Sequence, residues 1–115
     1  MAFGLQVQLP VTGAFGTDEE FDLRTDLERE FGLALVAERA GECGRGEIED
    51  GRMSLYMEAV ADPHLALRVV KDVLARFKLL HRAVVVLETR SKADPDEIDR
   101  QVLWPVHHAG AARVA

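Results

Sequence analysis

Hydrophobic and polar residues alternate at the start of the chain, which is the pattern of a strand with one buried face. In residues 3–9 every second residue is apolar, and Gln6 and Gln8 occupy the other face. The β-branched run 83–87 is too short for a helix and predicts a strand that is apolar on both faces. A last apolar segment, 102–106, contains Pro105, so we expect it either to form an edge strand or to cover the sheet as a clamp.

A helical pattern follows the first strand, with apolar residues three to four positions apart. Two capping boxes compete for the N-terminus of this helix, so that it begins at Asp18 or at Asp26. We expect the helix to run to about Arg39 and to end at Gly41, which would take the left-handed conformation of a C-terminal cap.

A second helix has clear signals at its N-terminus. Asp62 is the expected cap, and Pro63 fits the first helical position, where its missing N–H group costs nothing. An apolar stripe continues from there to Leu80. Asp94 and Pro95 repeat the same combination and predict a short third helix.

Residues 41–51 contain four glycines and four acids, and they could belong either to a phosphate-binding loop or to a sheet. The segment lacks both the glycine spacing and the lysine of phosphate loops, and its carboxylates would repel an anion. The pair Asp50-Gly51 instead favours a two-residue hairpin turn, because both positions of such a turn need a positive φ. We therefore expect a hairpin with its turn at these two residues.

The position of this turn predicts the register of the two hairpin arms. Counting back from it, Arg45 lies over the ring of Tyr56, and Cys43 faces Glu58 on the outer side of the sheet. The same register directs the remaining two glycines of the hairpin to the core side, namely Gly44 and Gly46.

The order strand, helix, hairpin, helix, strand predicts the ferredoxin-like βαββαβ fold, an α+β fold with two helices on one face of an antiparallel sheet. We expect one domain, with this core in residues 1–91, a C-terminal extension in 92–106 that forms a short helix or an edge strand, and a tail in 107–115. The other face of the sheet is then open. Its predicted side chains are Gln6, Gln8, Arg45, Glu47, Tyr56, Glu58, Val84 and Val86, or Val85 if the last strand is turned over.

Charge and cysteine content narrow the class of protein. The 115 residues include 14 basic and 20 acidic side chains, and the net charge of −6 is opposite to the charge that nucleic acid attracts. No apolar stretch is long enough to cross a bilayer, no secretion signal starts the chain, and the single cysteine cannot form an internal disulfide. We therefore expect a cytoplasmic protein that binds neither nucleic acid nor a membrane.

The segment 41–48, GECGRGEI, is followed by Gly51, by Leu55-Tyr56 and by the second helix with its Asp62 cap. This succession resembles a family of small bacterial ferredoxin-like domains of uncharacterised function, which have a glycine-rich hairpin of this kind. The resemblance implies the ferredoxin-like fold. It implies no activity, because glycines and pattern carry it and no catalytic residue does.

Few side chains suggest chemistry. His107 and His108 are adjacent, so on a strand they would point to opposite faces and could not bind one metal ion together. The expected neighbours of Cys43 are Glu42 and Glu58, whose charges would raise the pKa of a thiol and make it a poorer nucleophile. We therefore predict no catalytic residue, no cofactor and no metal site.

Three functions are consistent with these observations. The first is a non-catalytic module that binds a protein partner, or a second copy of itself as a homodimer, through the open sheet face. Its expected contact residues are Arg45, Glu47, Tyr56, Val84 and Val86. The second is an ACT-like sensor that holds a small-molecule effector near the turn 12–16. The third is a small α+β barrel enzyme with His64 or His81 in a pocket between the helices and the sheet.

Overall fold

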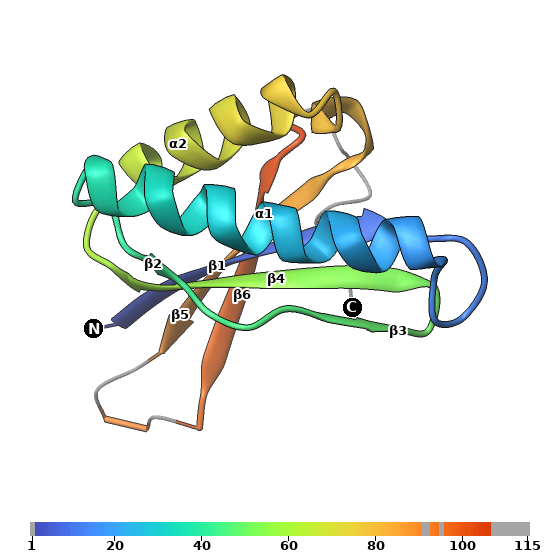
Figure 1. Ribbon diagram of the computed structural model, residues 1–115. Coiled ribbons are helices and arrows are strands. Elements are labelled where there is room, and N and C mark those ends of the chain that lie inside the picture. The colour runs from blue at the N-terminus through green and yellow to red at the C-terminus, as the bar shows by residue number, and fades with distance from the viewer. Residues whose placement is uncertain (1, 91–92, 95, 107–115) are drawn as a thin grey trace.

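Two helices lie on one face of an antiparallel sheet, as Figure 1 shows. The computed structural model describes residues 2–90, 93–94 and 96–106. Within these residues the strands are β1 (Ala2–Pro10), β2 (Glu42–Cys43), β3 (Glu47–Glu49), β4 (Arg52–Val60), β5 (Val84–Arg90) and β6 (Ile98–Trp104). The helices are α1 (Asp18–Ala37) and α2 (Pro63–Arg76), and the short 3₁₀ helix η1 (Leu80–Arg82) leads from α2 to β5. The predicted α+β class, with an antiparallel sheet, is confirmed.

The strands follow the order β2-β4-β1-β5-β6 across the sheet, and β3 pairs with β4 along the same edge as β2. Strand β1 lies in the centre, between β4 and β5. Its alternation has the predicted consequence, because Leu5 and Val7 are fully buried under the helices while Gln6 and Gln8 belong to the other face. The largest fully buried side chains of the core are Phe31, Leu5, Leu27, Leu35, Met53, Leu55, Met57 and Leu74.

Helix α1 begins at Asp18, the earlier of the two predicted positions. Thr17 and Glu20 form the capping box that fixes this start. The Thr17 hydroxyl accepts from the N–H of Glu20 at 3.1 Å, and the Glu20 carboxylate accepts from the N–H of Thr17 at 2.9 Å. The second box, which begins at Thr25, lies inside the helix, where the Thr25 hydroxyl donates to the carbonyl of Phe21 instead.

The C-terminus of α1 differs from the prediction. The helix ends at Ala37, and Arg39, with a φ of 53°, takes the left-handed conformation that was expected of Gly41. Gly41 has a φ of 149° and lies against β4, where a Cβ atom would come within 2.8 Å of the Glu58 carbonyl oxygen. The prediction that Gly41 caps the helix is therefore wrong, because close contact with the neighbouring strand is what requires a glycine there.

Helix α2 has the predicted N-terminus. Asp62 is the cap, and its carboxylate accepts from the N–H groups of His64 and Leu65 at 3.0 and 3.3 Å. Pro63 occupies the first helical position, as expected. The helix buries one apolar stripe against the sheet, formed by Ala66, Val69, Val70, Val73 and Leu74.

The hairpin turn is confirmed at Asp50 and Gly51, which have φ values of 53° and 77°. Next to the turn the pairs follow the predicted register, down to Glu47 opposite Ser54. Beyond Gly46 the register shifts by one residue, so that Cys43 pairs with Met57 and not with Glu58. The first arm thus contains one more residue than its partner, which is the geometry of a β-bulge.

The shift changes which face each side chain occupies. Cys43 packs against the core, so its predicted position on the outer side is wrong. Gly46 is buried beside Leu55, as predicted. Gly44 lies next to the side chain of Glu58, so its predicted position on the core side is wrong.

The C-terminal extension forms the edge strand β6, which pairs antiparallel with β5. A third helix was predicted at Asp94, but the described residues there form a turn. The N–H of Asp96 donates to the Asp94 side chain, and the N–H of Glu97 donates to the Asp94 carbonyl. Pro95 lies outside the described residues. At the end of β6 the Trp104 indole N–H donates to the carbonyl of Leu80 in η1 at 3.0 Å, and Trp104 packs against the core and does not cover the open face. The described residues thus have a turn where the short helix was expected, and 102–104 belong to an edge strand, which is the first of the two alternatives expected of 102–106.

Candidate interaction surface

The candidate surface is the sheet face that the helices leave open, the lower side of the sheet in Figure 1. Strand pairing joins side chains of this face into rows that cross the sheet. The central row runs from Tyr56 on β4 through Gln6 and Val86 to Val102 on β6. Val85 points to the core and is fully buried, so β5 is oriented with Val84 and Val86 on the open face.

Tyr56 and Glu47 are brought together at one end of this row. The Tyr56 hydroxyl donates to Glu47 Oε1 at 2.7 Å. Burial raises the pKa of Tyr56 above its ordinary value of 10.0, and the hydrogen bond to Glu47 raises it further, because ionisation would set two negative charges side by side. The pair therefore keeps the phenol protonated as a fixed donor.

The two predicted valines differ in accessibility. Val84 is half-buried, whereas Val86 is only 2% exposed. Gln6, the neighbour of Val86 on β1, is also buried. The Val86 side chain is therefore packed beneath its neighbours on the open face, while Val84 and Val102 present apolar atoms to solvent.

Arg45 is exposed in the bulge between β2 and β3. Its predicted stacking on Tyr56 is wrong, because the shifted register removes the pairing on which that contact depends. The cation–π contacts found among the described residues are Arg24 over Phe21 and Lys71 over Trp104. Tyr56 uses its hydroxyl group and Glu47 instead.

A hollow of about 410 Å³ opens on this face near the start of β1. Gly4 forms its floor between β4 and β5, where the absence of a side chain leaves the space. The strand beside it is bulged, with Ala59 at a φ of 55° and a register shift between Phe3 and Leu5. A Cβ atom at Gly4 would lie 3.1 Å from the Met57 carbonyl oxygen, so the bulge and the glycine belong together.

The walls of the hollow carry both charges. Tyr56 and Glu58 line it from β4, and Glu88, Ile98 and Arg100 from β5 and β6. Arg100 Nε donates to Glu88 Oε2 at 3.1 Å. The hydrophobic pattern of the sequence does not predict this hollow, although Gly4 inside an alternating strand is a signal of a bulge or a close approach.

The turn 12–16, where an effector was expected, is occupied by a side chain of the protein itself. The Glu20 carboxylate accepts from the N–H of Thr12 at 3.0 and 3.2 Å and from the N–H of Thr17 at 2.9 Å. The backbone bond from Thr12 is the largest influence that lowers the pKa of Glu20, followed by the bonds from Thr17. Glu20 thus takes donors that an anionic effector would use.

The other candidate catalytic or metal-binding residues are histidines that do not line the hollow and a cysteine whose thiol pKa is raised. His64 and His81 are exposed, and neither lines the hollow; His107 and His108 lie outside the described residues. Burial, followed by the charges of two nearby glutamates, raises the pKa of the Cys43 thiol to about 11. In the described part of the chain, no three His, Cys, Asp or Glu side chains are grouped so that they could hold a metal ion.

Comparison of the chain with family models, with curated proteins and with solved structures gives no match. No helix in residues 2–90, 93–94 and 96–106 is long and apolar enough to span a membrane. The geometry of the open sheet face is thus the main evidence on function.

Proposed function

We propose that this chain is a ferredoxin-like, non-catalytic binding module whose open sheet face docks onto a protein surface. The strand order β2-β4-β1-β5 supports the fold assignment. In a βαββαβ unit β2 and β3 would be two halves of the second strand, interrupted by the bulge, and β6 would be an added edge strand.

The observation that carries the proposal is the make-up of the open face. Protein interfaces combine an apolar centre with a polar rim and directed hydrogen-bonding groups. Here Val84 on β5 and Val102 on the edge strand β6 present partly exposed apolar atoms, and the hydrogen-bonded pair of Tyr56 and Glu47 presents polar groups on the opposite side of the sheet. The hollow over Gly4 adds a concave feature that a projecting side chain of a partner could fill.

The protonation states of the Cys43 thiol and the Tyr56 phenol support a binding role. At neutral pH a thiol with a pKa of about 11, as in Cys43, is almost wholly protonated and unreactive. The raised pKa of Tyr56 likewise keeps its phenol neutral. Both groups are therefore suited to packing and hydrogen bonding more than to attack on a substrate.

The proposal can be tested with charged substitutions on the open face. Val84→Arg places a cation among the apolar atoms of the surface and Tyr56→Arg places one on its polar side, and both should abolish cross-linking to proteins that the wild-type chain captures, including a second copy. Leu33→Arg is the matched control, because Leu33 is 63% exposed on α1, on the other side of the molecule. If cross-linking to a partner persists in both face variants but is lost in Leu33→Arg, the proposed face is refuted.

A small-molecule sensor is the second candidate, and the hollow is the observation that favours it. Its size of about 410 Å³ falls within the range of ligand sites. A thermal-shift screen against amino acids and nucleotides should then give a stabilising compound, and Ile98→Arg, which obstructs the hollow, should remove the effect. A compound that stabilises both proteins equally would place the site elsewhere.

A further inference from the structure

The open face carries opposite net charges on its two sides. We define the acidic side as the charged residues of the segment from β2 to β4, which comprise five acids and two arginines: Glu42, Glu47, Glu49, Asp50, Glu58, Arg45 and Arg52. We define the basic side as the charged residues that β5 and β6 direct to the same face, namely Glu88, Arg90 and Arg100. The first set has an excess of negative charge and the second an excess of positive charge.

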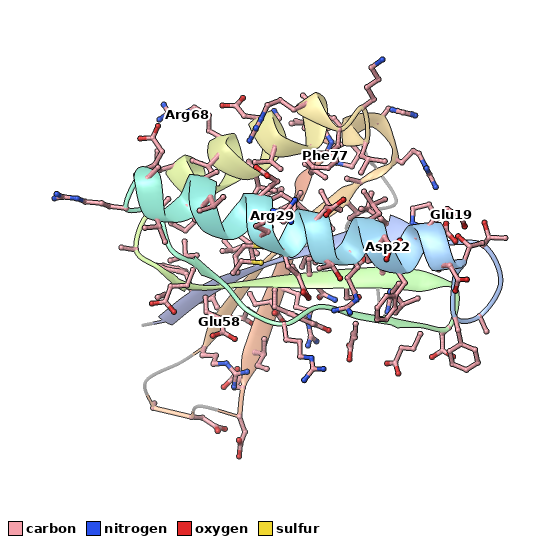
Figure 2. The ribbon with its side chains drawn as sticks, in the orientation of Figure 1. Glu19, Asp22, Arg29, Glu58, Arg68 and Phe77 are labelled. Carbon is pink, nitrogen blue, oxygen red and sulfur yellow. The ribbon has the colours of Figure 1, made fainter. Side chains whose placement is uncertain are left out.

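Glu58 is the acid best placed to meet another molecule. It is exposed, it lines the hollow, and it forms no ion pair within the described part of the chain. Figure 2 shows it beneath the sheet, opposite the side where Glu19 and Arg68 project from the helices. Its carboxylate is therefore available to a cation supplied from outside.

Arg100 is the corresponding cation on the basic side. Its side chain is 59% exposed. The bond from Nε to Glu88 uses one of the five N–H donors of a guanidinium group, so the others can serve a second acceptor. Glu88 also fixes the orientation of the group, which lowers the entropy cost of a further contact.

The open face of the sheet is curved, with the two charged sides on its two walls. In Figure 1, β5 and β6 turn away from the plane of β4 on the side opposite the helices, so the open face is curved. The hollow lies within this curve, with β4 on one wall and β6 on the other. A docked surface would meet negative charge along one wall and positive charge along the other.

We infer that the partner of this face is a second copy of the chain, an inference that rests on the proposed function. A twofold axis that runs parallel to the strands between β1 and β5, in the plane of the interface, sets β6 of each copy over β4 of the other. Glu58 then lies opposite the partner's Arg100, and the symmetry makes this contact twice. Val84 and Val102 provide apolar contact where the two sheets cross.

Light scattering of the full chain across a range of concentrations tests the inference. The wild-type protein should approach twice its mass of 12.7 kDa as the concentration rises. Glu58→Arg and Arg100→Glu each set like charges against one another in both contacts, and each should raise the dimer dissociation constant about 100-fold. An equimolar mixture of the two variants should form a heterodimer with nearly wild-type affinity, because every contact again joins an arginine to a glutamate.

Matched controls lie on the helices. Glu19→Arg and Arg68→Glu make the same charge changes on exposed positions of α1 and α2 and should leave the dissociation constant unchanged. Should circular dichroism show that Arg100→Glu is unfolded, Arg100→Gln keeps a donor for Glu88 and should still raise the constant about tenfold. A folded Arg100→Gln with the wild-type constant would overturn the inference.

The remaining outcomes separate this inference from the proposed function. A wild-type chain that stays monomeric at every concentration overturns the second-copy inference, and the face-dependent cross-linking experiment then decides the proposed function by itself. A dimer that neither charge reversal weakens, and that Val84→Arg also leaves intact, uses another surface and overturns the second-copy inference. Loss of the homodimer in both reversals without recovery in the mixture overturns the pairing of Glu58 with Arg100.

Discussion

Removal of the Glu28 carboxylate should destabilise the edge of the sheet. Glu28 Oε2 accepts from the N–H of Gly46 at 2.8 Å and lies 2.7 Å from Nη1 of Arg24. Arg24 in turn donates to the carbonyl of Gly46 at 3.2 Å. Two side chains of α1 thus bind both backbone groups of a buried glycine in the bulge, where the strand ladder is interrupted. Glu28→Ala leaves the N–H group and the guanidinium without their shared acceptor.

The expected loss in the free energy of unfolding is about 2 kcal/mol. A hydrogen bond to a charged group contributes about 1.5–3 kcal/mol. The ion pair with Arg24 adds no more than about 0.5 kcal/mol, because the Glu28 side chain is 23% exposed and solvent screens it. Water that enters the vacated position recovers part of the loss, which favours the lower half of the range. For a domain of this size, the melting temperature should fall by about 6–10 °C.

Urea denaturation followed by circular dichroism, and by fluorescence of Trp104, the only tryptophan of the chain, measures this loss. Asp26→Ala is the matched control, because Asp26 pairs with Arg29 at 3.2 Å on the same helix but both side chains are about half exposed or more. That substitution should cost less than about 0.5 kcal/mol. A Glu28→Ala protein no less stable than Asp26→Ala would refute the argument that α1 holds the bulge.

Three further predictions follow from ionisable groups. Because burial and nearby acids raise the pKa of Cys43 to about 11, a thiol reagent at pH 8 should react much more slowly with the folded chain than with the chain in urea; equal rates would contradict this. Tyr56 is the only tyrosine, so absorbance at high pH reports its titration alone, and Glu47→Gln should lower the raised midpoint towards 10.0. The backbone bonds from Thr12 and Thr17 lower the pKa of Glu20 below 4.5, so its contribution to stability is present above that pH and is lost as the pH falls through the folded value. The difference in melting temperature between wild type and Glu20→Gln should therefore shrink below about pH 4.5, and a constant difference would contradict the assignment.

Elements with local signals could be predicted from the sequence. Asp62 and Pro63 fix the start of α2, and Asp50 and Gly51 fix the hairpin turn, because each signal acts on backbone groups within a few residues. The same holds for the buried face of β1, which alternation alone determines. These elements are sufficient for the α+β class with helices on one face of an antiparallel sheet.

The roles of the hairpin glycines could not be predicted, because they depend on distant residues. Gly41 is required by the Glu58 carbonyl of β4, and Gly46 by the Ser54 carbonyl, which a Cβ atom would approach to 2.9 Å. The register shift between them coincides with the place where two side chains of α1 bind Gly46. Counting outwards from the turn assumes an uninterrupted ladder, so it is correct up to the bulge and wrong by one residue beyond it.

The candidate site depends on the same irregularities. Glu58 lies between two glycines. On one side, a Cβ atom at Gly44 would come within 3.2 Å of Glu58 Oε1. On the other side of Glu58, Gly4 forms the floor of the hollow. A side chain at either position would occupy space that the Glu58 carboxylate now uses or faces. The bulge that moves Cys43 into the core is also what brings Gly44 beside Glu58. The glycine-rich segment therefore positions an acid on the open face, which suits a cationic contact with a partner and is the reverse of what an anion-binding loop would do.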